Sequence, residues 1–190
     1  MAITAVLLAG GQSRRMGRDK ATLEWRGRPL WECQLEKLRA LAPAKILISA
    51  RGNTPWVPAD AQLIMDTPPS RGPVSGLCAA FACLDTEHLL ALAVDMPFIT
   101  VDQLRRTCES IANGCGVIPL VQGRPEPIAT VYAKETGNEF AAALEGPDFS
   151  LQQVVTKLIG QGQLHPMQVS ESDWRLYKSV NEPRDLDVEL

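Results

Sequence analysis

The sequence lacks an excess of charge of either sign, a long apolar run and a large aromatic content. It has 19 Lys plus Arg against 22 Asp plus Glu, a net charge of −3, and only 5% aromatic residues. A protein that binds duplex nucleic acid usually carries a basic excess, so we expect no nucleic-acid partner. The longest apolar run beyond the N-terminus, Leu89 to Val94, is far shorter than a bilayer span, so we expect no membrane association.

Cysteine pairs are also absent from the sequence. The five residues Cys33, Cys78, Cys83, Cys108 and Cys115 form no CxxC motif, which favours reduced thiols over disulfides or a zinc site. The N-terminal apolar stretch lacks the basic region that begins a signal peptide. Together these absences predict a cytoplasmic protein.

Length and hydropathy predict one domain, 1–190, in which strands alternate with helices. The run 3–8 is apolar throughout, as expected for a strand buried on both faces of a parallel sheet. Further strands are expected at 45–50, 62–65, 89–94, 115–120 and 128–132, with strand-like pieces at 165–169 and 176–180. Helices are expected at 30–42, after Gly72-Pro73, at 101–112, after Ser150, and after Asn181, which is the expected N-cap of a short last helix. This alternation predicts a three-layer α/β fold, a mostly parallel sheet with helices on both faces.

Three predicted strand ends carry glycine or aspartate, and ligands of such sheets bind beyond the carboxyl ends of the strands. After the first strand, residues 8–20 read LAGGQSRRMGRDK. The small residues let backbone N–H groups approach a ligand, and the Arg and Lys side chains suit phosphate oxygens. The spacing is neither Walker A nor GxGxxG, which disfavours a dinucleotide oxidoreductase. Asp66 and Asp95 end two later strands. On these residues alone, a basic surface loop and two turn aspartates remain the alternative.

The full segment 8–20 resembles the nucleotide-binding signature LAGGxSxRMGxDK of the molybdenum cofactor guanylyltransferase family, molybdopterin nucleotidyltransferase-like NTP transferases. The matching positions are Leu8, Ala9, Gly10, Gly11, Ser13, Arg15, Met16, Gly17, Asp19 and Lys20. The resemblance continues in order through Asp66, Gly72-Pro73, 95–98 and 180–183. It implies a Rossmann-like fold of the nucleotide-diphospho-sugar transferase kind.

The resemblance also implies a role for each matching residue. Leu8, Ala9, Gly10 and Gly11 would bind the nucleotide together with Lys20, Asp66 and Asp95. The catalytic set would be Arg15, Lys20 and Asp95. Asp95 would be the metal ligand, with Mg²⁺ as the cofactor. Arg15 and Asn181 would bind the acceptor.

The implied reaction is Mg²⁺-dependent transfer of GMP from GTP to the phosphate of molybdenum-molybdopterin, with molybdoenzymes or cofactor-delivery proteins as possible partners. The double glycine Gly10-Gly11 favours GTP, because relatives that use cytidine nucleotides carry Ala at the first position. Family members have Asn where this chain has Ser49, His where it has Glu126, and Asn where it has Ser179. Glu126 and Ser179 lie in segments that the family uses around the acceptor, so they bear on molybdopterin as the acceptor more than on nucleotidyl transfer. The alternatives are cytidylyl transfer to molybdopterin, transfer to a sugar phosphate, and a non-catalytic nucleotide-binding module.

Overall fold

A computed structural model describes residues 2–10, 19–52, 54–66, 70–147 and 149–186 of the chain. It contains an eight-stranded sheet of order β10-β7-β9-β6-β1-β4-β5, with β8 paired to β7. The sheet strands are β1 (Ile3–Leu8), β4 (Lys45–Ala50), β5 (Gln62–Met65), β6 (His88–Ala93), β7 (Gly116–Val121), β8 (Arg124–Pro125), β9 (Val131–Ala133) and β10 (Leu164–Gln168). A separate antiparallel hairpin consists of β2 (Glu24–Trp25) and β3 (Arg28–Pro29).

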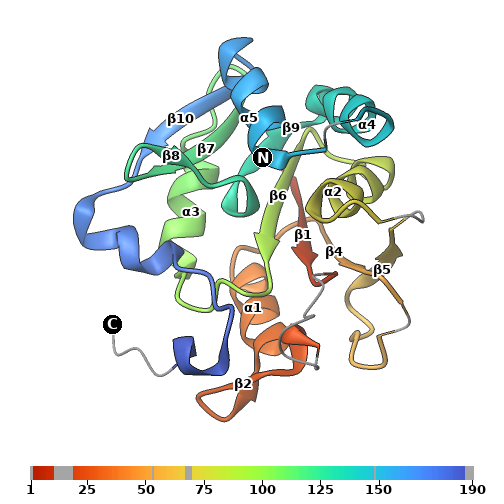
Figure 1. Ribbon diagram of the computed structural model, residues 1–190, viewed down its shortest axis with the longest axis vertical. Helices are drawn as coiled ribbons and strands as arrows, with labels where there is room; N and C mark the ends of the chain where they lie inside the picture. The colour runs from red at the N-terminus through yellow and green to blue at the C-terminus, as the bar shows by residue number, and fades with distance from the viewer. Residues whose placement is uncertain (1, 11–18, 53, 67–69, 148, 187–190) are drawn as a thin grey trace.

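The sheet is mostly parallel, as the sequence predicts. Strand β1 lies between β6 and β4 and is parallel to both, and β5 continues the parallel order beside β4. Strand β9 is antiparallel to β6 and β7. The carboxyl ends of β1, β4, β5 and β6 therefore meet at one edge of the sheet, seen below the centre of Figure 1. This edge collects the three strand ends that the sequence singles out.

Within the part of the chain that the structure describes, five α-helices cover the sheet, together with several short 3₁₀ segments (Figure 1). The α-helices are α1 (Leu30–Arg39), α2 (Pro73–Ala82), α3 (Val101–Glu109), α4 (Gly137–Glu145) and α5 (Leu151–Gly160). The 3₁₀ segments are η1 (Lys20–Thr22), η2 (Pro127–Ala129), η3 (Lys134–Thr136), η4 (Glu171–Tyr177) and η5 (Pro183–Leu186).

The apolar run of β1 serves two cores, because successive side chains of a strand point to opposite faces. Ala5 and Leu7 belong to a core with helices α1 and α3. Val6 and Leu8 belong to a second core with helices α2, α4 and α5. Helices thus lie on both faces of the sheet, and the three-layer prediction is confirmed.

Several predicted elements need correction. The first helix ends at Arg39 rather than 42, and Ala42 has a positive φ of 50° that a helix does not allow. The strand expected at 128–132 is the 3₁₀ segment η2 followed by β9. The strand expected at 176–180 is wrong, because η4 extends to Tyr177 and no strand follows it within the described residues. Helix α4 was not predicted.

The structure bears on two expectations from the sequence, one about the cysteines and one about membrane-spanning segments. All five cysteines are free thiols, as expected. Across the described ranges, no helix combines the length and the hydropathy that crossing a membrane requires.

Candidate active site

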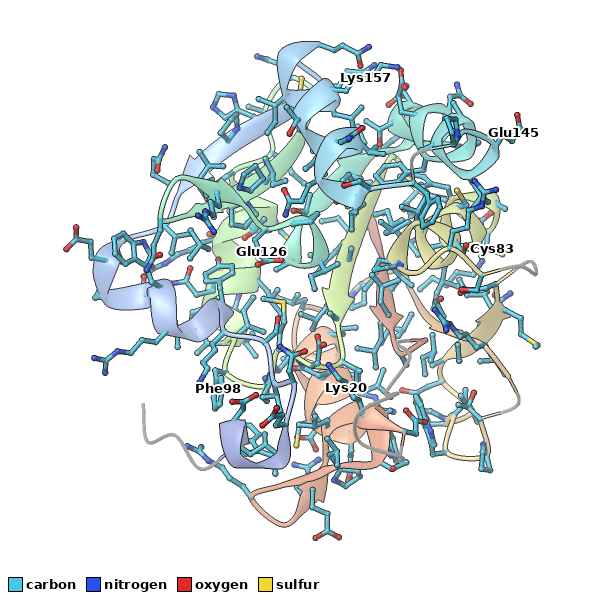
Figure 2. The ribbon with its side chains drawn as sticks, viewed as in Figure 1. Lys20, Cys83, Phe98, Glu126, Glu145 and Lys157 are labelled. Atoms are coloured by element: carbon cyan, nitrogen blue, oxygen red, sulfur yellow. The ribbon has the colours of Figure 1, made fainter. Side chains whose placement is uncertain are left out.

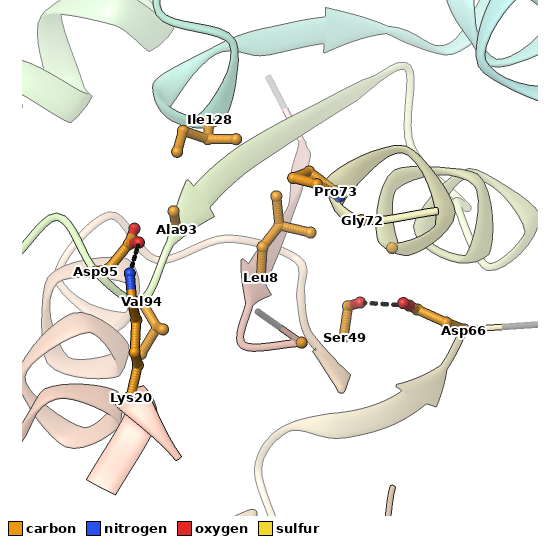
Figure 3. A pocket seen from close by; sticks show the side chains of 12 residues that line it. Leu8, Lys20, Ser49, Asp66, Gly72, Pro73, Ala93, Val94, Asp95 and Ile128 are labelled. Atoms are coloured by element: carbon orange, nitrogen blue, oxygen red, sulfur yellow. Dashed lines mark hydrogen bonds and ion pairs between the residues drawn. The ribbon is translucent and has the colours of Figure 1, made fainter. Parts of the chain in front are cut away.

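A pocket lies at the carboxyl ends of β1, β4, β5 and β6, beside the start of α2 (Figure 3). Its walls come from segments that are far apart in the sequence. The lining residues are Leu8, Gly10, Lys20, Ser49, Asp66, Gly72, Pro73, Gly76, Ala93, Val94, Asp95 and Ile128. Leu8 lies between two polar ends of this pocket, one near Asp95 and one near Asp66 (Figure 3).

The first polar end, called the ionic end, consists of Lys20, Asp95, Val180 and Asn181. Lys20 Nζ donates to Asp95 Oδ2 at 2.9 Å, to the Val180 carbonyl oxygen at 3.0 Å and to Asn181 Oδ1 at 3.0 Å. The Val180 N–H donates to the Asp95 carbonyl oxygen at 2.7 Å, which ties the C-terminal segment to the end of β6. Lys20 begins η1, whose N-cap Asp19 accepts from the Ala21 N–H. The fold therefore brings Lys20 and Asp95, two of the charged residues that the sequence singles out for catalysis, into direct contact.

The second polar end, called the hydroxyl end, consists of Gly10, Ser49, Asp66 and Ser70. Asp66 is buried, with 8% of its surface exposed. Its Oδ1 accepts from Ser49 Oγ at 3.1 Å, and its Oδ2 accepts from Ser70 Oγ at 2.7 Å. A carboxylate offers about four lone-pair directions, so Asp66 keeps acceptor capacity for a ligand. Ser49, which stands where the resemblance implies Asn, thus orients Asp66 together with Ser70.

Two glycines shape the wall between the hydroxyl end and helix α2. Gly72, the N-cap of α2, has φ of 69° and ψ of −146°, a conformation that only glycine adopts without strain. A Cβ on Gly76 would clash with Ser49 Oγ and lie 3.1 Å from Leu8 Cδ2. Gly76 therefore lets α2 pack directly against β4 and β1, and the start of α2 reaches the pocket.

Glu126, which immediately precedes η2, lies above Lys20 in the view of Figure 2, and its charge interacts with that of Asp95. In the sequence it stands where the resembling family usually has histidine. Burial raises the pKa of its carboxyl group to about 7, the Ile128 N–H opposes this shift, and the negative charge of Asp95 adds to it. The backbone of Glu126 is held by bonds from its N–H to Pro119 and from Thr130 Oγ1 to its carbonyl oxygen. Glu126 thus carries a carboxyl group whose pKa is about 7, close enough to Asp95 for the two charges to interact. The signal in the sequence that could have identified Glu126 is its place before Pro127, in the pair that aligns with the family's His-Pro.

The oxygen atoms of the ionic end already surround a cation, the Lys20 ammonium group. Carboxylate, amide and carbonyl oxygens are also the donors that Mg²⁺ takes, usually through one or two carboxylates and the phosphates of a substrate. Among the described residues, His, Cys, Asp and Glu form no group of three or more that could hold a metal. The residues present fit a cation that shares its ligands with a substrate, not one enclosed by protein.

The positions expected from the sequence fall into four groups. Those that line the pocket are Leu8, Gly10, Lys20, Asp66 and Asp95. Asn181 joins the ionic end through its bond to Lys20. Ala9 is buried, and its N–H donates to the Ser49 carbonyl oxygen at 2.8 Å, so its contribution is to the backbone of the turn. Gly11 and Arg15 lie outside the described residues.

The comparisons with known proteins identify the family of this chain. The family model for the MobA-like NTP transferase domain matches residues 5–162. A probable molybdenum cofactor guanylyltransferase of Opitutus terrae is 31% identical over 99% of this chain and 95% of its own length. A molybdenum cofactor guanylyltransferase of Xanthomonas euvesicatoria pv. vesicatoria is 37% identical over 59% of this chain and 57% of its own length.

Solved structures show the same fold. The molybdopterin-guanine dinucleotide biosynthesis protein A of Archaeoglobus fulgidus superposes with a TM-score of 0.75 at 22% identity, covering 97% of this chain and 95% of that one. A 4-diphosphocytidyl-2C-methyl-D-erythritol synthase of Anaerococcus prevotii gives a TM-score of 0.75 at 13% identity, covering 98% and 93%. These likenesses place the fold among the nucleotide-diphospho-sugar transferases, as expected from the sequence.

Proposed function

The chain belongs to the family of the MobA-like NTP transferase domain, a family of nucleotidyltransferases, and we propose that it transfers GMP from GTP to molybdenum-bearing molybdopterin. An oxygen of the acceptor's terminal phosphate forms a bond to the α-phosphorus of GTP. The bond from that phosphorus to the β-phosphate oxygen breaks, and pyrophosphate leaves. The names of the relatives from Opitutus terrae and Xanthomonas euvesicatoria support this substrate pair.

The observation that carries the proposal is the meeting of Lys20 and Asp95, 2.9 Å apart in a pocket at the carboxyl ends of the strands. Two polyanions must come together in this reaction, so catalysis is mainly positional and electrostatic. Lys20 supplies a positive charge for the triphosphate. Asp95 and Asn181 would hold Mg²⁺ through their side-chain oxygens, and the chemistry it would supply there is positive charge beside the phosphate oxygens.

No residue of the pocket needs to remove a proton from the nucleophile, because a phosphate acceptor is already ionised near neutral pH. The protein's task is therefore to hold the acceptor in line and to exclude water. Asn181, whose Oδ1 already accepts from Lys20, is suited to orient the acceptor beside Asp95. Arg15 keeps its predicted role in binding the acceptor and the triphosphate.

Gly10 supports guanine as the base. A Cβ at this position would lie 3.7 Å from Asp66 Oδ2 and 3.4 Å from Arg51 Cγ. Without that methyl group, the space between the backbone and Asp66 is open to the larger, purine ring. Asp66 would accept hydrogen bonds from N–H groups of the base.

Pyrophosphate release tests the proposal directly. The protein is supplied with Mg²⁺, either GTP or CTP, and one acceptor: molybdenum-molybdopterin, metal-free molybdopterin or a sugar phosphate. We expect release with GTP and molybdenum-molybdopterin, and none in the presence of EDTA.

Each other outcome selects an alternative from the sequence. Faster release with CTP indicates a cytidylyltransferase, and release with a sugar phosphate indicates a different acceptor class. Binding of GTP without turnover on any acceptor indicates a nucleotide-binding module.

A further inference from the structure

Arg51, which immediately follows β4, borders the hydroxyl end of the pocket. Its Cγ lies 3.4 Å from the point that a Cβ on Gly10 would occupy, and Asp66 Oδ2 lies 3.7 Å from the same point. Arg51 also lines a second hollow that shares Gly72 and Pro73 with the first pocket. The Arg51 side chain and the Asp66 carboxylate thus flank one opening above the Gly10 backbone.

The guanidinium group of Arg51 has an unused donor. Its Nε is buried, and it has no hydrogen-bond partner among the described residues. Other arginines are paired differently: Arg39 binds the Asp60 carboxylate through Nε at 2.8 Å and Nη2 at 2.7 Å. A buried N–H without an acceptor is costly, and native proteins satisfy nearly all such groups. Because its Nε has no acceptor where it now lies among the described residues, Arg51 gains a hydrogen bond when its side chain turns toward a ligand at the hydroxyl end.

The two side chains that flank Gly10 have opposite hydrogen-bonding character. Asp66 only accepts, and Arg51 only donates, in a planar fork. Guanine presents donors at N1 and the 2-amino group, and adjacent acceptors at O6 and N7, which suit an arginine fork. Cytosine has its adjacent acceptors, N3 and O2, on the same edge as its 4-amino donor, so it cannot present one edge of donors to Asp66 and a separate edge of acceptors to Arg51.

We propose that Arg51 is a specificity-determining residue that donates to the O6/N7 edge of guanine while Asp66 accepts from its N1 and 2-amino groups. The inference rests on the proposed function, because it requires GTP to occupy this pocket. It assigns discrimination between bases to a side chain outside the glycine-rich loop.

Calorimetric titration of the full chain with the Mg²⁺ complexes of GTP, 7-deaza-GTP, ITP and CTP tests this assignment. 7-deaza-GTP lacks the N7 acceptor, and ITP lacks the 2-amino group. The variants are Arg51→Ala and Arg51→Met, of which the second keeps the apolar stem beside Gly10. Arg105→Ala is the control, since it removes an exposed arginine paired with Asp102 on α3.

In the wild-type protein we expect GTP to bind more tightly than 7-deaza-GTP and ITP. Both Arg51 variants should bind GTP about 5- to 100-fold more weakly, the discrimination of a bidentate arginine–guanine contact. They should no longer distinguish GTP from 7-deaza-GTP, but they should still distinguish GTP from ITP. CTP binding should be unchanged, and Arg105→Ala should behave as wild type.

Two results would overturn the assignment of Arg51. One is an unchanged ratio of GTP to 7-deaza-GTP affinity in both variants. The other is an equal loss of GTP and CTP affinity, which would mean that Arg51 serves the phosphates. Failure of the proposed function is separate, because it appears in the wild-type protein as an absence of GTP binding or a preference for CTP.

Discussion

The two ends of the pocket hold their carboxylates in opposite ways. Asp95, at the ionic end, is paired with an ammonium group 75 residues away in the sequence. Asp66, at the hydroxyl end, is held by the hydroxyl groups of Ser49 and Ser70, which lie 17 and 4 residues away. One end depends on contacts between distant segments, and the other on neighbouring strand ends.

This difference separates a site that must rearrange from one that is already formed. A lysine ammonium group has three donors, and all three of Lys20 are used by Asp95, Val180 and Asn181. Lys20 must release at least one of these oxygens to bind a phosphate. Asp66 needs no such change, because its hydroxyl partners leave acceptor positions toward the pocket. We infer that the base binds a preformed surface and the phosphates reorganise the ionic end.

The strongest test of this comparison is Asp95→Ala, which breaks the ionic end only. We expect kcat to fall by about 10²- to 10³-fold, as when an electrostatic group at the reacting phosphate is lost. Binding of GTP in EDTA should persist, because Lys20 is released from its partners and the hydroxyl end is intact. The thermal midpoint should change little, because Lys20 keeps its bonds to the Val180 carbonyl oxygen and Asn181 Oδ1 when the Asp95 carboxylate is removed.

Asp102→Ala, an exposed change on α3 away from the pocket, is the matched control and should keep full turnover. Single-turnover kinetics with GTP and molybdenum-molybdopterin measures both variants. Near-normal turnover by Asp95→Ala in Mg²⁺ would remove Asp95 from the mechanism.

The second prediction is that the stability of the folded protein depends on pH through the carboxyl group of Glu126, which interacts with Asp95 of the ionic end. Its pKa is raised from 4.5 to about 7, mainly by burial. The folded protein therefore binds more protons than the unfolded chain between these values, and stability falls as pH rises through this window. At 1.36 kcal/mol per unit, the loss is on the order of 3 kcal/mol. Asp95, Tyr132 and Tyr177 are the ionisable neighbours whose charges couple to it.

Denaturant unfolding at intervals from pH 5 to pH 8 measures this slope. Glu126→Gln should flatten it and should be more stable than wild type at pH 8. Glu109→Gln, at an exposed position, should leave the slope unchanged. Equal losses in wild type and Glu126→Gln would assign the pH dependence to other groups.

Helices and strands could be predicted from the sequence wherever the spacing of apolar residues is typical of only one kind of element. The run Ile3–Leu8 is buried on both faces, and it gives its strand with the predicted bounds. Helix α4 has glycine at its first position and no side-chain cap, so no start signal precedes it. At 176–180, Tyr177 at the end of η4 and Val180 in the irregular backbone after it are both buried, and this apolar spacing alone resembles a strand.

The site could be predicted where a residue's role follows from its place at a strand end. Asp66 and Asp95 are such residues, and parallel topology brings their strands to one edge. The partners of Lys20 at Val180 and Asn181 depend on how the C-terminal segment returns to the sheet, which no local pattern specifies. The same holds for Arg51, whose importance comes from its distance to Gly10 and Asp66.

The third prediction weakens the hydroxyl end through packing, by Gly76→Ala. The new methyl group would clash with Ser49 Oγ and crowd Leu8, so α2 must shift or Ser49 must turn away from Asp66. Overpacking of this kind costs about 1–3 kcal/mol, partly offset by the better helix propensity of alanine.

Gly160→Ala makes the same change in α5 with no heavy atom within 4 Å of the added methyl, so it is the matched control. Thermal unfolding should show Gly76→Ala below wild type and Gly160→Ala at or above it. If the two variants melt together, the close approach of α2 to β4 contributes nothing to stability.

The smallest predicted effect comes from Gly10→Ala, which changes the hydroxyl end without strain. Its nearest contacts would be 3.4–3.8 Å away, at Arg51, Asp66 and Ala50, so the thermal midpoint should stay at the wild-type value. The methyl group takes space beside Asp66 that a purine needs, so GTP affinity should fall about tenfold while CTP affinity is kept. Gly52→Ala, where a Cβ meets no atom within 4 Å, is the control. Competition between GTP and CTP for binding measures the ratio, and an unchanged ratio would mean that the base does not lie against Gly10.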